Sequence, residues 1–421
     1  MTSDVQRRKA MKRVRGTEAL RWLRHVLKWL GLGAGVALLA GTASAWFLLA
    51  LAWATDTREA NRWLLALLPV AGFVVGWVYL RVGQAVEAGN NLLIDEVHDP
   101  RQVVPVRMAP LIFLSTVVSH LFGASVGREG TAVQMGGALA DQFTHVFRLR
   151  AEDRRILLMA GISAGFASVF GTPLAGAVFG LEVLAIGRLR HDALWPCVVA
   201  AVVADQVCAL WGVHHGAYSA GLLPALSVST LGAAMVVGLL CGLVGMAFAR
   251  GTHGLSAFMK QRVPYAPLRP LLGGIVLAGV IWSTDAWRYA GLSLPGLAQA
   301  FTEPLPWWDF ALKGLFTSFS LGVGFKGGEV TPLFYIGATL GNALAPLLHQ
   351  PFPWLAALGF VAVFAGAANT PLACILMAME IFGVGIGAHA ALACVVSYLA
   401  SGHAGIYKAQ RVDGSKYRWR R

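Results

Sequence analysis

Two short stretches of this sequence place a carboxylate at the expected start of a helix. Residues 127–131 read GREGT and residues 327–331 read GGEVT, so Glu129 and Glu329 each stand two residues before a threonine. A helix N-terminus presents unpaired backbone N–H groups and the positive end of the helix dipole, and it therefore attracts anions. A carboxylate at this place imitates a bound anion and can also carry a proton. The two stretches therefore place an acidic side chain where an anion is expected to bind.

Other polar side chains stand at similar breaks in the apolar pattern. Asn90 and Asn91 follow a glycine, and each is interpreted equally well as a helix cap or as an anion ligand. Thr331 is expected to cap the next helix, with Pro332 at its first position. Tyr407 follows the last apolar run and is expected to be either a residue of the aromatic belt at the membrane interface or a phenolic donor to an anion.

The composition is that of a membrane protein. The chain of 421 residues is 57% hydrophobic and only 13% charged, whereas soluble proteins average about 25% charged residues. Several apolar runs reach the roughly 20 residues that span a bilayer. An ionisable group inside such a run is costly and marks function by default, which singles out Glu129 and Glu329. Glu182 and Glu380 stand late in their runs, where a structural role is expected.

The excess of positive charge lies at the two ends of the chain. Residues 1–28 hold nine Lys/Arg and residues 408–421 hold six, while the rest of the chain holds 19 basic and 18 acidic residues. We expect basic cytoplasmic segments at 1–28 and 408–421 around a transmembrane domain at 29–407, because basic segments stay on the cytoplasmic side. Contact with anionic lipid explains this charge better than nucleic-acid binding does.

No cofactor or metal is expected. The five cysteines all fall inside apolar runs without CxxC spacing, and the eleven histidines show no metal-ligand spacing.

The chain contains an internal repeat. The GREGT stretch recurs as GGEVT at an offset of 200 residues, and GTPLAGAVFGLEVL (171–184) recurs as NTPLACILMAMEIF (369–382) at an offset of 198. We therefore expect two homologous halves, about 60–212 and 225–400, with a binding site between them. Glycine and Thr-Pro breaks predict interrupted helices, which membranes tolerate where the freed backbone lines a cavity. The sequence leaves open whether the repeat is inverted.

One pattern points to a different class of protein. The segment GASVG (123–127) fits the G-x-S-x-G pattern around a serine nucleophile, and His389 is a distant partner for Ser125. An intramembrane serine protease is thus a remote alternative, which explains neither the repeat nor the paired glutamates.

The quoted motifs resemble those of the CLC family of anion channels and anion/proton exchangers. GREGT is similar to the family's GREGP stretch, whose glutamate gates the anion path, and Tyr407 matches the tyrosine that contacts the central anion. The resemblance covers about residues 60–410. It implies an all-α polytopic fold built as an inverted repeat of broken, tilted transmembrane helices. It also implies a homodimer with one pathway per subunit.

The departures from the family pattern resemble its fluoride-exporting branch, the CLC-F fluoride/proton antiporters. Relatives selective for chloride carry Gly-Ser-Gly-Ile-Pro where this chain has Gly-Asn-Asn-Leu-Leu (89–93), so Asn90 replaces the chloride-binding serine. Fluoride is small and tightly hydrated, and its site must supply strong hydrogen-bond donors. Val183 stands where chloride/proton exchangers place a second glutamate, which leaves Glu329 as the expected internal proton acceptor.

The resemblance therefore implies a secondary transporter of the bacterial cytoplasmic membrane that exports fluoride in exchange for protons. A chloride/proton exchanger or a chloride channel of the same fold is the alternative. Glu129 is the expected gate and Glu329 the expected proton-transfer group. The expected anion-binding residues are Asn90, Gly127, Arg128, Gly130, Val330, Thr331 and Tyr407.

Overall fold

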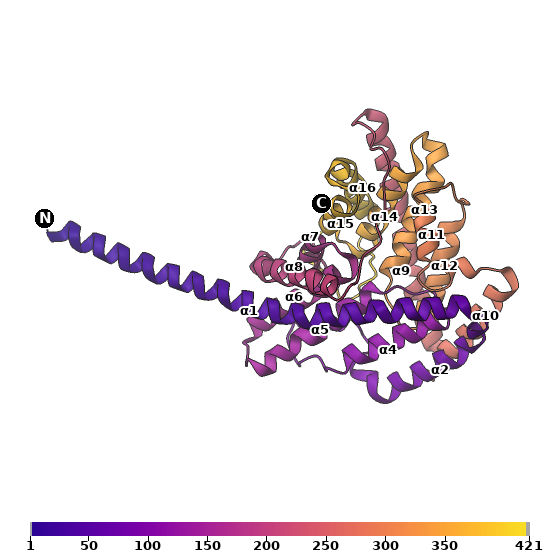
Figure 1. The fold of residues 1–421 in the computed structure, drawn as a ribbon, viewed down its shortest axis with the longest axis horizontal. Coiled ribbons are helices and arrows are strands. Elements are labelled where there is room, and N and C mark those ends of the chain that lie inside the picture. Colours follow the sequence, from indigo (N-terminus) through magenta and orange to yellow (C-terminus); the bar gives the residue numbers. More distant parts are fainter. Residues whose placement is uncertain (1, 418–421) are drawn as a thin grey trace.

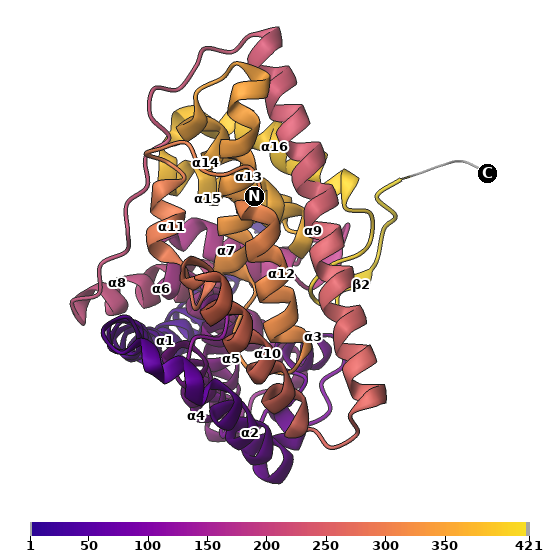
Figure 2. The same ribbon diagram turned by 90° about the vertical axis from the view of Figure 1, so that its right-hand side faces the viewer.

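The chain folds almost entirely into helices (Figures 1 and 2). The computed structural model describes residues 2–417, and side chains from residue 18 onward. Arg418, Arg420, Arg421 and the basic side chains before residue 18, which mark the predicted basic segments, lie outside the described part. The first half contains α1 (Thr2–Ala60), η1 (Arg62–Leu67), α2 (Leu68–Val78), the π-helical turn η2 (Tyr79–Gly83), η3 (Gln84–Val86), α3 (Asn90–His98), α4 (Met108–Leu121), α5 (Glu129–Val146), α6 (Ala151–Phe170), α7 (Pro173–Glu182), β1 (Ala185–Ile186), η4 (His191–Ala193) and α8 (Leu194–Leu210).

The second half repeats this order after a loop. It contains α9 (Val228–Arg262), α10 (Leu268–Thr284), η5 (Trp287–Tyr289), α11 (Leu294–Gln299), α12 (Asp309–Gly322), α13 (Val330–Leu348), α14 (Phe352–Ala368), α15 (Pro371–Phe382), η6 (Val384–Ile386), α16 (Gly387–Ala400) and β2 (Arg411–Val412). Within the described residues, five helical segments are long and apolar enough to cross a membrane. The 10-residue α7 and 12-residue α15 are too short to cross alone, which confirms the predicted interrupted helices.

The two halves meet in opposite directions. Gly127, two residues before Glu129, and Gly328, one residue before Glu329, form an antiparallel backbone pair with N···O distances of 2.5 and 2.8 Å. The carboxylate of Glu182, at the end of α7, accepts hydrogen bonds from the first N–H groups of α15. Glu380, near the end of α15, does the same for α7. These reciprocal contacts give Glu182 and Glu380 the structural role expected of them, and they require an inverted repeat.

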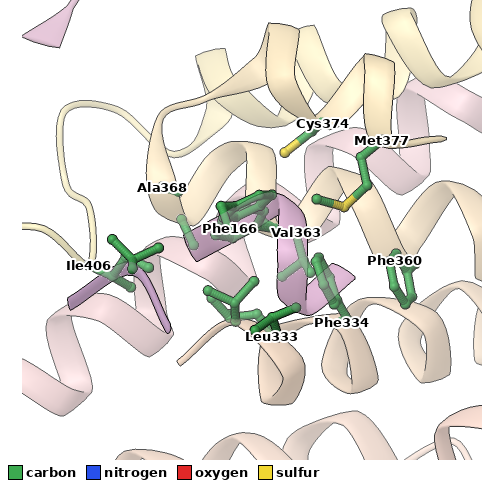
Figure 3. Close-up of a cluster of buried hydrophobic side chains, with 14 of the residues drawn as sticks. Phe166, Leu333, Phe334, Phe360, Val363, Ala368, Cys374, Met377 and Ile406 are labelled. Atoms are coloured by element: carbon green, nitrogen blue, oxygen red, sulfur yellow. The ribbon is translucent and has the colours of Figure 1, made fainter. Parts of the chain in front are cut away.

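Glycines allow the paired helices of each half to approach closely. A Cβ on Gly337 of α13 would collide with the Gly359 carbonyl of α14, and one on Gly136 of α5 with the Gly161 carbonyl of α6. Beside these contacts lies an aromatic core to which both halves contribute (Figure 3). Phe166 of α6 stacks on Phe364 at 6.2 Å between ring centroids. The glycines therefore allow α5 to pack closely on α6, and α13 on α14.

A buried ion network fixes α5 and α6 to α3. Arg154 donates to Asp141 at 2.8 Å and to Glu96 at 2.9 Å. Removing the cation would leave two carboxylates without it in a region of low solvent access. Arg154→Met is expected to lower the free energy of unfolding by about 3–5 kcal/mol. Denaturant titration in detergent measures this loss, and the exposed Arg150→Met is the control. Equal losses in the two variants would contradict a stabilising network.

The structure describes parts of both terminal segments, predicted at residues 1–28 and 408–421. α1 runs from Thr2 to Ala60 without a break at residue 28. The C-terminal segment is packed against the body, because β2 pairs in parallel with β1 and Lys416 donates to Asn369 Oδ1 at 2.6 Å. Gln410 donates to the carbonyl of Val183 at 3.0 Å. The segment after Tyr407 therefore holds that residue in place.

Candidate functional site

Glu129 reaches across the boundary between the two halves. It is the first residue of α5 and is fully buried. Its Oε2 accepts a hydrogen bond from the backbone N–H of Thr331 at 2.9 Å, and its Oε1 accepts one from the Thr331 hydroxyl. Arg128 Nε donates to the same carboxylate at 3.1 Å. The carboxylate thus occupies the N-terminus of α13, which is the place where an anion is expected to bind.

Glu329, its repeat mate, is held quite differently. It precedes the first residue of α13, and its Oε2 is buried without a hydrogen-bond partner among the residues that the structure describes. Thr131, the counterpart of Thr331, shares a hydrogen bond with Thr116 at 2.8 Å between hydroxyl oxygens. The halves are therefore equivalent in sequence but not in bonding. The Glu129 carboxylate is hydrogen-bonded to the start of α13, in the other half, whereas Glu329 Oε2 is an unused acceptor.

Asn90 lies beside Glu329. A Cβ placed on Gly130 would lie 3.1 Å from Asn90 Nδ2 and 3.5 Å from Glu329 Oε2, so both side chains converge on this glycine. Gly89, at φ 60°, is the N-cap residue of α3, and Asn90 is its first residue. Asn90 Oδ1 is buried and has no hydrogen-bond partner within the described part of the chain. Asn91 instead accepts a hydrogen bond from the backbone N–H of Ala409 at 2.9 Å.

Two cavities lie beside the residues of this site. The larger, of about 280 Å³, is lined by Asn90, Glu329 and Tyr407 and opens beside the C-terminal segment. The smaller, of about 40 Å³, is lined by Arg128, Glu129 and Thr331. The two repeat-related carboxylates therefore line different cavities.

Most predicted site residues are brought together, but some local predictions are wrong. Val330, the first residue of α13, is buried at the site. Helix α13 begins one residue before Thr331, so Thr331 is not its cap and Pro332 is not its first residue. The Thr331 hydroxyl donates to Glu129 instead, because that carboxylate is the acceptor within reach. Tyr407 is 6% exposed and lines the larger cavity, so it lies at the site itself.

The serine and histidine of the protease alternative have separate partners. Ser125 Oγ accepts a hydrogen bond from Lys313 Nζ at 3.0 Å. His389 contacts the hydroxyl of Thr230 at 3.2 Å. The structure therefore offers no support for a Ser125–His389 pair.

The sequence patterns missed the basic lining of the larger cavity. Lys260, Lys326 and Lys408 line it together with His253, against the acids Glu87 and Glu329. The ammonium group of Lys326 lies over the Tyr79 ring, 4.2 Å from its centroid. These residues come from four separate segments, so no local motif joins them. Their positive charge raises the local concentration of anions beside the site.

Comparisons with known proteins agree with this geometry. A family model described as voltage gated chloride channel matches residues 71–402. A chloride/fluoride channel protein of Pseudomonas syringae pv. tomato is 62% identical over 413 residues, which covers 97% of this chain and 91% of the relative. An H(+)/Cl(-) exchange transporter ClcA of Cronobacter sakazakii is 27% identical over 373 residues, covering 81% of this chain and 79% of the relative. The crystal structure of a CLC-type fluoride/proton antiporter aligns with TM-score 0.89 and 33% identity, over 92% of this chain and 98% of that one.

Proposed function

Because this chain belongs to the voltage-gated chloride channel (CLC) family, we propose that it exchanges fluoride for protons across the membrane and thereby exports fluoride. The observation that carries the proposal is the Glu129 carboxylate seated on the N–H and hydroxyl groups of Thr331. Those donors are the ones that a small anion requires. The relatives named for fluoride support the choice of ion.

The geometry supports a cycle in which one site accepts either a carboxylate or fluoride. When Glu129 is ionised, it occupies the N-terminus of α13 and closes the path. A proton removes its charge and weakens its hold on the donors, because charge-assisted hydrogen bonds are about twice as strong as neutral ones. The vacated donors of Thr331 then bind fluoride. The unpartnered Oε2 of Glu329 accepts the proton on the side of the larger cavity.

Fluoride-electrode and pH readings on one liposome sample test this exchange. An outward fluoride gradient is expected to drive protons inward, and this inward flow should disappear without protein. Fluoride movement with no accompanying proton movement would indicate a channel, and proton movement driven by chloride but not by fluoride would indicate a chloride exchanger.

Selectivity for fluoride is assigned to Asn90, whose amide is aimed at the site without capping α3. Asn90→Ser replaces the amide by a shorter hydroxyl, which leaves room for a larger, less hydrated anion. The ratio of chloride to fluoride turnover in liposomes is expected to rise about tenfold, a change of roughly 1.4 kcal/mol in relative barrier height.

The matched control for this experiment is Asn91→Ser. Asn91 also lines the larger cavity, but its side chain accepts from the backbone N–H of Ala409 and is not among the groups that converge on Gly130, so its replacement should leave the ion ratio unchanged. An unchanged ratio in folded Asn90→Ser protein would remove Asn90 from the set of anion ligands.

The topology and assembly are also proposals. The basic residues of segments 1–28 and 408–421 support cytoplasmic termini. The larger cavity, which is lined by Lys408, is then proposed to open toward the cytoplasm. A homodimer with one pathway per subunit is consistent with a site to which both halves of one chain contribute.

A further inference from the structure

A third cavity, separate from the two at the functional site, lies where α1 ends and is lined by several arginines. Its volume is about 480 Å³, and it is bounded by the end of α1 together with η1, η5 and α11. Its charged lining residues are Arg58, Arg62, Arg288 and Glu59. The proposed exchange uses none of these groups. Asp309 pairs with Arg288 from outside the lining, so three guanidinium groups face two carboxylates, and the remaining positive charge favours an anionic ligand.

Two of the guanidinium groups have hydrogen-bond capacity to spare. Arg58 is 6% exposed, and its contacts are His120 O at 2.9 Å and Glu59 Oε1 at a long 3.5 Å. A guanidinium has five N–H donors, so most of those on Arg58 are unused. Arg288 pairs with Asp309 at 3.0 Å, while its Nε is buried without a partner. The buried Arg58 is costly with so few acceptors, and a ligand anion would supply acceptors both to it and to the half-exposed Arg288, which otherwise donates to Gln299 at 3.3 Å.

The surroundings of the cavity belong to the membrane interface. Arg62 lies over the ring of Trp287 at 5.1 Å from its centroid, and Trp287 packs edge-on against Trp282. Trp63 and Trp282 are both exposed on the surface nearby. Tryptophans gather at the level of the lipid headgroups. The cavity is therefore expected to lie at the depth of phosphate groups of the lipid.

We propose that this cavity binds the phosphate group of an anionic lipid headgroup. Arginine binds phosphate through paired N–H donors, and Arg58 and Arg62 line the wall on either side of the break between α1 and η1. The neighbouring Pro295 and Leu294 offer apolar contact to the glycerol backbone. The headgroup of phosphatidylglycerol matches this combination of charge and apolar surface.

The cavity wall is joined to the loop that carries Glu129. Lys313 donates to Gly291 O and Ser293 Oγ, each at 2.8 Å, and to Ser125 Oγ at 3.0 Å. Ser293 lines the cavity, and Ser125 stands four residues before Glu129. A headgroup bound in the cavity would therefore stabilise the segment that leads from Ser125 to Glu129.

Thermal unfolding of the purified protein in neutral detergent, with added phosphatidylglycerol, tests the proposal. The lipid is expected to raise the unfolding temperature in a saturable manner. Because Arg58 also holds His120, the variant of choice is the exposed Arg62→Gln. This change is expected to weaken the apparent affinity for the lipid about fivefold.

Arg81→Gln is the matched control, because Arg81 is likewise exposed and lies over an indole ring, that of Trp77, at 5.6 Å. Its affinity for the lipid should equal that of the unchanged protein. Equal stabilisation of Arg62→Gln and the unchanged protein would overturn the assignment to this cavity. Equal protection by inorganic phosphate would overturn the lipid as the source. Since binding is measured without transport, neither result depends on the proposed exchange.

Discussion

Glu129→Gln is expected to end proton movement coupled to fluoride. Glutamine keeps the size of the side chain and can still accept from Thr331, but it neither carries charge nor takes up a proton. The alternation between a charged, closed state and a neutral, open state is then lost. In liposomes with an outward fluoride gradient, proton uptake is expected to fall to the level of protein-free vesicles. The remaining fluoride flux should no longer respond to a pH gradient.

Glu303→Gln, in an exposed loop, is the control for the same change of charge elsewhere. It should retain the coupling of the unchanged protein. If Glu129→Gln still takes up protons in response to the fluoride gradient, Glu129 is not the group that carries the coupled proton. Comparing unfolding curves of the two variants ensures that they are equally folded.

Glu329→Gln is expected to fold normally and to lose proton-coupled fluoride transport. The Oε2 of Glu329 is buried beside Asn90 without a hydrogen-bond partner, so no structural bond is lost with its charge. A purely structural carboxylate would have a donor here, yet the neighbouring Lys326 lies over Tyr79 instead. Glutamine preserves the shape but cannot pass a proton to Glu129. Simultaneous fluoride and pH recording measures the effect.

The control for this variant is a carboxylate in the same cavity. Glu87 lines the larger cavity and is exposed, so Glu87→Gln changes the cavity charge by the same amount. Only the change at Glu329 should uncouple transport. Coupling in Glu329→Gln equal to that in Glu87→Gln would place the proton route elsewhere.

The repeat explains how much of the site was predictable. Because a carboxylate, a threonine and their spacing recur at an offset of 200 residues, the sequence predicted that Glu129 and Glu329 meet between the halves. The repeat by itself does not distinguish the two carboxylates, and Glu129 was predicted as the gate only from the resemblance of GREGT to the family's GREGP stretch. The hydrogen bond between Thr131 and Thr116, which accompanies the difference between the halves, has no signature in the motif.

Contacts between distant segments could not be predicted from the sequence motifs. Arg154 meets Glu96 and Asp141 from elements 58 and 13 residues away, and nothing local marks the three as partners. The start of α13 was misplaced because threonine before proline is a typical start of a helix. Here Glu129 supplies a stronger partner for that threonine than the helix backbone does.

Uphill transport tests the central claim of fluoride/proton exchange most directly. Liposomes containing the protein are loaded and bathed with equal fluoride concentrations, and a pH gradient is then imposed with the inside alkaline. Protons that enter down their gradient should drive fluoride out of the liposomes, so that its external concentration rises above its internal concentration. An external fluoride electrode should record this rise, and a protonophore should abolish it. A fluoride concentration that stays level in the external solution while the pH gradient persists would contradict the account.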